Sequence, residues 1–103
     1  DLVAYGAELG SCQSMVAPFM GDDTFTPDVS YRNASVTLSA ITVPVVVVIG
    51  KEDPIVRAAQ VAVFNDEQVI TVENSGHFDV IHPKTEAFSA VLTALETIKT
   101  KGQ

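Results

Sequence analysis

Acidic residues and a histidine follow two apolar segments of this chain, where a catalytic pair could form. Glu52 and Asp53 come directly after the apolar run 43–49, and His77 follows the shorter run 68–73. A carboxylate bound to one imidazole nitrogen fixes the tautomer and stabilises the imidazolium, which leaves the other nitrogen to act as a general base. Asp53 precedes His77 by 24 positions. Asp53 is therefore the candidate acid and His77 the candidate base.

Two strands are expected to position this pair. The run 43–49 is rich in valine and almost continuously apolar, which is typical of a strand buried on both faces of a parallel sheet. A second strand is predicted over 68–73 and a helix over 56–64 between the two. Strand, helix and strand in this order imply a right-handed parallel crossover. Because the carboxyl ends of adjacent parallel strands share one edge, we expect Asp53 and His77 to lie together.

The rest of the chain divides into a helical tail and a less regular beginning. A final helix is predicted over 85–99, because its apolar residues share one face: Phe88, Val91, Leu92, Leu95 and Ile98. Residues 3–20 predict two short helices with a bend, since glycines and Pro18 interrupt their helical spacing. A loop follows, with a helical turn opening near 26–27. The predicted class is α/β, with a helical segment over 1–42 and a βαβα part over 43–103.

Two motifs in the second half carry a family resemblance. The segment Val-Pro-Val-Val-Val-Val-Ile-Gly-Lys-Glu-Asp-Pro-Ile-Val (43–56) and the segment Val-Glu-Asn-Ser-Gly-His-Phe (72–78) resemble the acid loop and the histidine loop of α/β-hydrolases. The segments 77–81 and 31–35 are similar to esterase and arylformamidase-like members. The resemblance implies that Asp53 is the triad acid, that His77 is the general base, and that a small acyl substrate is hydrolysed without a cofactor.

The resemblance covers residues 31–99 and leaves out the nucleophile. No Gly-x-Ser-x-Gly elbow and no His-Gly-Gly segment occurs in the 103 residues. In the family these motifs lie upstream, so we expect about 100–200 further residues before Asp1, from the size of a complete domain. That half, if it is a separate polypeptide, is the expected partner. Residues 1–42 would then be a lid-like segment, and the chain alone would be inactive.

Composition excludes some partners. The net charge is −7, from 13 acidic and 6 basic residues, and this disfavours nucleic acids and anionic membranes. The single cysteine, Cys12, precludes an internal disulfide and favours a reducing compartment such as the cytoplasm only slightly. A hydrophobic content of 47% suggests surfaces that another polypeptide covers. A non-catalytic module that binds a partner through its open sheet edge is therefore the alternative function.

Each candidate residue also has a simpler interpretation. Asp53 could merely cap a helix that begins near Pro54, and His77 could be an ordinary loop histidine. His77, Asp79 and His82 fit no standard metal-ligand spacing, so no metal is expected. Asp79 is expected to hold the loop by hydrogen bonds, and Glu52, the neighbouring acid, to be solvated.

Cys12 could be a nucleophile only if it lay on a strand-to-helix turn, which its surroundings do not suggest. It is instead expected to pack as a small buried side chain.

Overall fold

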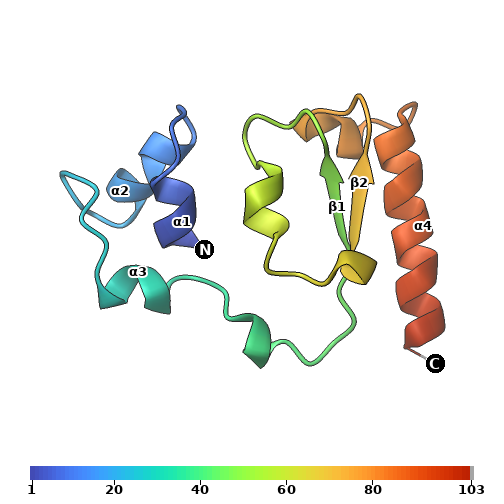
Figure 1. Cartoon of the computed structure of the whole chain (residues 1–103), viewed down its shortest axis with the longest axis horizontal. Helices are drawn as coiled ribbons and strands as arrows, with labels where there is room; N and C mark the ends of the chain where they lie inside the picture. The colour runs from blue at the N-terminus through green and yellow to red at the C-terminus, as the bar shows by residue number, and fades with distance from the viewer. Residues whose placement is uncertain (103) are drawn as a thin grey trace. The chain divides into compact units, whose positions relative to one another are not determined.

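The chain forms two compact units that meet in sequence between Thr42 and Val43. The computed structural model describes residues 1–102 and divides into Asp1–Thr42 and Val43–Gln103. Helices and a parallel sheet make the protein a mixed α/β structure (Figure 1). Within residues 1–102, every helix is too short or too polar to cross a membrane. Each unit is described by itself.

The first unit contains only short helices. They are α1 (Leu2–Gly6), the 3-10 turn η1 (Gln13–Met15), α2 (Val16–Phe19), α3 (Val29–Asn33) and the 3-10 turn η2 (Leu38–Ala40). The expected pair of short helices over 3–20 corresponds to α1 and α2. Two of these helices have an aspartate as N-cap: Asp1 and Asp28 accept hydrogen bonds from the first-turn N–H groups of α1 and α3.

Tyr31 is the centre of the first unit. It is 1% exposed, and its hydroxyl donates a hydrogen bond to Asp22. Its ring meets Phe25 edge to face, with centroids 5.6 Å apart. Burial, followed by the bond to Asp22, raises the pKa of Tyr31 to about 12. Tyr31 therefore stays neutral and anchors its unit by packing and one partly buried hydrogen bond.

The second unit is built on two parallel strands. β1 (Val47–Gly50) pairs with β2 (Val69–Val72) in the register Val47↔Val69 to Gly50↔Val72, which confirms the predicted parallel pairing. Both strands are shorter than predicted. β1 begins late because no strand within residues 1–102 pairs with residues 43–46, and because Pro44 lacks an N–H donor. Val43 is 68% exposed instead of buried.

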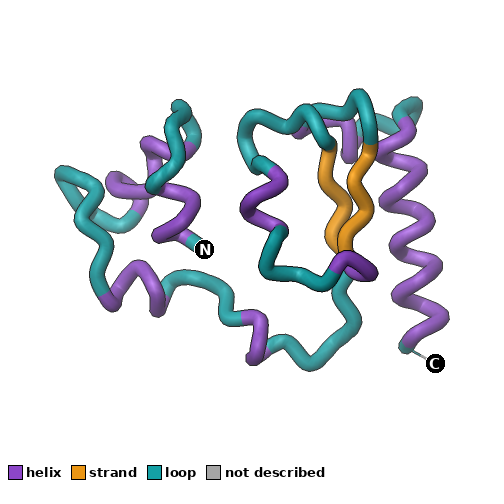
Figure 2. The backbone as a smooth tube through the Cα atoms, in the orientation of Figure 1, coloured by secondary structure: helices purple, strands orange, loops and turns teal. Residues whose placement is uncertain are grey.

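The helix predicted over 56–64 is absent, and that prediction was wrong. The crossover holds only two 3-10 turns, η3 (Ala58–Val61) and η4 (Asp66–Gln68) (Figure 2). Val63 remains 67% exposed, so within the described chain the crossover lacks the packed apolar face that stabilises a helix of this length.

The final helix is confirmed, and its predicted apolar face is buried in part: Phe88, Val91 and Ile98 are half-buried. α4 (Glu86–Lys101) begins at the N-cap Thr85 and packs beside both strands (Figure 1). Its most buried residues are Ala87 at 0% and Ala94 at 5% exposure, whereas Leu92 and Leu95 are 50% and 56% exposed. The small side chains of Ala87 and Ala94 let the helix approach the rest of the unit closely, whereas Leu92 and Leu95 lie outside this contact.

Candidate active site

Asp53 lies in the loop that follows β1, and its two carboxylate oxygens have different partners. The residue is only 8% exposed. Oδ1 accepts hydrogen bonds from the N–H groups of Ile55 at 2.8 Å and Val56 at 2.9 Å. This is the capping interaction considered above, although it closes a tight turn rather than starting the expected helix. Because one oxygen caps the turn, Oδ2 is left for another partner.

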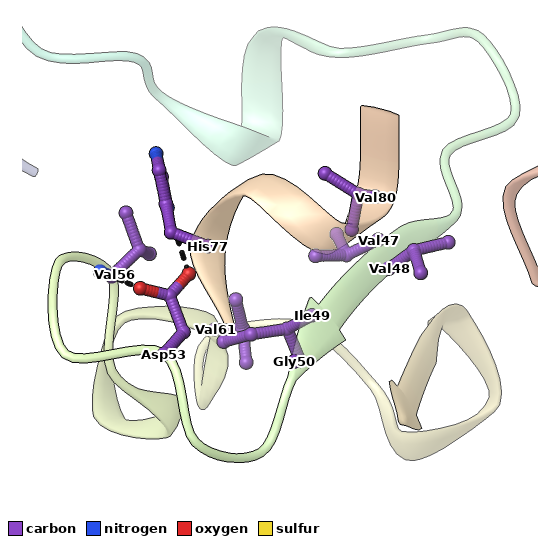
Figure 3. Close-up of a pocket in the computed structure, with 9 residues that line it drawn as sticks. All are labelled: Val47, Val48, Ile49, Gly50, Asp53, Val56, Val61, His77 and Val80. Carbon is purple, nitrogen blue, oxygen red and sulfur yellow. Dashed lines mark hydrogen bonds and ion pairs between the residues drawn. The ribbon is translucent and has the colours of Figure 1, made fainter. Parts of the chain in front are cut away.

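That partner is His77. Nδ1 of His77 lies 2.8 Å from Oδ2 of Asp53, so the predicted contact is present (Figure 3). His77 begins the 3-10 turn η5 (His77–Ile81), which follows β2 across the loop 73–76. The His77 side chain is 34% exposed, and within residues 1–102 no group hydrogen-bonds to its Nε2. The pair therefore presents one imidazole nitrogen that is free to exchange a proton.

The hydrogen bonds around Asp53 keep it ionised. Burial alone would raise the pKa of this carboxyl group. The hydrogen bonds from the Val56 N–H, from His77 and from the Ile55 N–H, together with the charge interaction with His77, outweigh burial, and the pKa of Asp53 lies below its ordinary value of 3.8. A buried carboxylate beside an imidazole at neutral pH is the charge arrangement that a catalytic acid–histidine pair requires.

The two loops are fixed to each other through their main chains. The N–H of Lys51 donates to the carbonyl oxygen of Val72 at 2.9 Å, and the N–H of Glu52 donates to that of Ser75 at 3.0 Å. Gly50 lies so close to this loop that a Cβ atom placed there would stand 2.2 Å from the Ser75 oxygen. The sequence indicated the strand end at Gly50 but not this approach, although a glycine at a strand end can mark one.

Ser75, like Gly50, helps to hold the two loops, and nothing in the sequence indicated this role. It is 4% exposed, and its hydroxyl donates to the carbonyl of Glu73 at 3.1 Å. The Ser75 hydroxyl thus ties together the loop between β2 and His77, which helps to fix the position of the turn that His77 begins.

An open apolar hollow of about 170 Å³ adjoins the pair. Asp53 and His77 lie at its edge, together with valines and Ile49 from β1, the crossover and η5 (Figure 3). It is lined by Val47, Val48, Ile49, Gly50, Asp53, Val56, Val61, His77 and Val80. Apolar side chains beside the pair lower the polarity of its surroundings, which strengthens the electrostatic interaction between Asp53 and His77.

The other sequence candidates lie as follows. Glu52 is exposed, as expected for a solvated side chain. Asp79 accepts a hydrogen bond from the Gly76 N–H at 2.7 Å, which confirms that it holds the loop. Nδ1 of His82 accepts from the Lys84 N–H at 3.3 Å. Across residues 1–102, no three His, Cys, Asp or Glu side chains lie close enough to share a metal ion. Cys12 is exposed, so its predicted burial was wrong: it lies in a turn beside other exposed residues.

Comparison of the chain with known protein families, with curated protein sequences and with solved structures finds no match. The fold and the site define a mixed α/β protein in which a buried aspartate is hydrogen-bonded to a partly exposed histidine at the ends of two parallel strands.

Proposed function

We propose that this chain supplies the acid and the general base of a serine hydrolase of the α/β-hydrolase type, acting on carboxylic esters or related acyl bonds. The observation that carries the proposal is the 2.8 Å contact between Asp53 Oδ2 and His77 Nδ1 at the carboxyl ends of adjacent parallel strands. Site chemistry at this edge of a parallel sheet is the rule for open α/β proteins.

The roles of the two residues follow from the proton positions. With Asp53 ionised, Nδ1 of His77 carries a proton and donates a hydrogen bond to Oδ2 of Asp53. Nε2 therefore has no proton and is the basic nitrogen. Nε2 takes the proton of a serine hydroxyl as its oxygen attacks the acyl carbon, and it then gives that proton to the leaving alcohol. A water molecule repeats the exchange to release the acid. Asp53 stabilises the imidazolium during both steps without becoming protonated.

The nucleophile in this proposal belongs to sequence outside these residues. No serine of the chain stands in a Gly-x-Ser-x-Gly elbow, and Ser75 is bonded within its own loop. Large apolar side chains remain exposed near the site turn, Phe78 at 68% and Ile81 at 72%. An apolar surface of this kind, next to the hollow beside β1, favours coverage by further polypeptide that carries the serine.

A binding module without catalysis is the second candidate. β1 pairs with β2 along one edge, and no other strand in residues 1–102 pairs along its second edge. A free edge of this kind can add a strand from a partner. A module of this sort has no need for a buried aspartate bonded to a histidine, which is why the hydrolase is the better supported function.

The experiment uses the intact protein in which this chain occurs, with every polypeptide that copurifies. Mass spectrometry under denaturing conditions identifies the polypeptides, and a fluorophosphonate probe then reports an activated serine. We expect labelling in the wild type, its loss in His77→Ala, and its retention in His82→Ala, a matched control in the same region. Labelling that persists in His77→Ala, or a complete assembly without an activated serine, would overturn the proposal in favour of the binding module.

A further inference from the structure

The turn that carries His77 is tied together by a side chain within it. Oδ2 of Asp79 accepts a hydrogen bond from the N–H of Gly76 at 2.7 Å. This bond spans His77 and Phe78 and closes the first turn of η5. The His77 backbone is therefore held between the donor and the acceptor of one short, charge-assisted hydrogen bond.

A second side chain connects this turn to α4. Oγ1 of Thr85 lies 2.5 Å from the carbonyl oxygen of Asp79 and 2.8 Å from that of His82. The same Oγ1 accepts the N–H of Phe88 at 3.1 Å and thereby caps α4. The longest helix of the chain and the histidine turn thus share one hydroxyl group.

The two members of the acid–histidine pair are held in different ways. Asp53 is buried, and hydrogen bonds to Ile55 and Val56 fix it within its own loop. The His77 side chain is 34% exposed, and the ring it meets edge to face, Phe78, is itself 68% exposed. Side-chain packing alone leaves the imidazole loosely held, so its place depends on the backbone turn beneath it.

We propose that Asp79 and Thr85 are positioning residues, which keep Nδ1 of His77 within hydrogen-bond distance of Asp53. They act through the backbone of η5 and do not touch the reacting atoms. The inference rests on the proposed function for its kinetic consequence only, because the geometry of the Asp53–His77 bond can be measured without any reaction.

The test compares Asp79→Ala with Asp79→Asn in the intact protein. Alanine removes the acceptor for the Gly76 N–H, whereas asparagine keeps an oxygen there. Asp28→Ala is the matched control, since Asp28 also accepts a backbone N–H, that of Ser30 at 2.9 Å, but in the first unit. We measure kcat and KM with an ester substrate, and the NMR resonance of the proton shared by His77 and Asp53, assigned with His77→Gln.

In Asp79→Ala we expect kcat to fall at least about tenfold, because small misplacements of a catalytic group are costly, with KM unchanged. The shared-proton resonance should weaken or broaden. Asp79→Asn should restore both, and Asp28→Ala should change neither. If Asp79→Ala does not fold, Thr85→Val should show the same losses and Thr85→Ser should reverse them.

Two failures are distinguishable. A folded Asp79→Ala or Thr85→Val protein that keeps both kcat and the shared-proton resonance would overturn the positioning role, whatever its melting temperature. Hydrolysis that does not depend on His77 would overturn the proposed function instead, and the resonance would still decide whether Asp79 positions the histidine.

Discussion

Gly50 and Ser75 approach each other so closely that no larger residue fits at position 50 without a shift of the backbone. A Cβ atom at Gly50 would lie 2.2 Å from the carbonyl oxygen of Ser75 and 2.9 Å from that of Gly76. Backbone atoms cannot move aside as a flexible side chain can. This contact sets how near the acid loop lies to the histidine loop.

Replacing Gly50 by alanine is therefore expected to destabilise the protein by about 1–3 kcal/mol, the range for an overpacked site. The free energy of unfolding in urea measures the effect. Gly76→Ala is the control: its Cβ would lie 3.8 Å from Asp79 Oδ2, and its φ of −98° suits any residue. Equal losses in the two variants would contradict the role given to the Gly50–Ser75 contact.

Asparagine at position 53 should abolish most activity while keeping the fold. Its side-chain oxygen can still accept the N–H groups of Ile55 and Val56, but the charge that stabilises the imidazolium is gone. We expect kcat to fall by about 10⁴-fold, the scale found when a triad aspartate becomes asparagine. Ester hydrolysis measures the change, and Glu52→Gln, at an exposed neighbour, should retain full activity. A mild loss in Asp53→Asn would remove Asp53 from the triad.

The lowered pKa of Asp53 predicts how stability depends on pH. A carboxyl group with a lower pKa in the folded state stabilises the fold above its unfolded pKa of about 3.9, and this contribution is lost as the pH falls through the folded pKa. Asparagine does not titrate. The difference in unfolding free energy between the wild type and Asp53→Asn should therefore shrink as the pH falls below about 3.9. Chemical denaturation from pH 5 to pH 3 measures it, and a difference that stays constant over this range would contradict the prediction.

The alanines of α4 mark its buried face. Ala87 is fully buried, so Ala87→Leu should lower the free energy of unfolding by about 1–3 kcal/mol. Ser89→Leu places the same side chain at an exposed position of the same helix and should change stability by less than about 0.5 kcal/mol. Thermal or urea unfolding of the two variants compares them directly. A smaller loss at Ala87 than at Ser89 would mean that the helix packs through another face.

Local pattern was sufficient to predict several features. The valine-rich run predicted a parallel strand, the apolar spacing over 85–99 predicted α4, and the order of the elements predicted that Asp53 and His77 meet. These predictions depend on near neighbours in sequence or on the geometry that all parallel strands share. The catalytic role of the pair stays a prediction.

Tertiary structure decided the rest. The helix expected over 56–64 did not form because the segment is only partly buried within the described chain and Val63 stays exposed, and β1 begins at Val47 because a strand needs a partner to bond with. The two oxygens of Asp53 have different partners only because the chain turns at Ile55 and Val56, whose N–H groups bind Oδ1 and leave Oδ2 for His77. Strand pairing, helix burial and loop contact all join residues far apart in sequence, and their energies depend on what lies opposite, which no local pattern records.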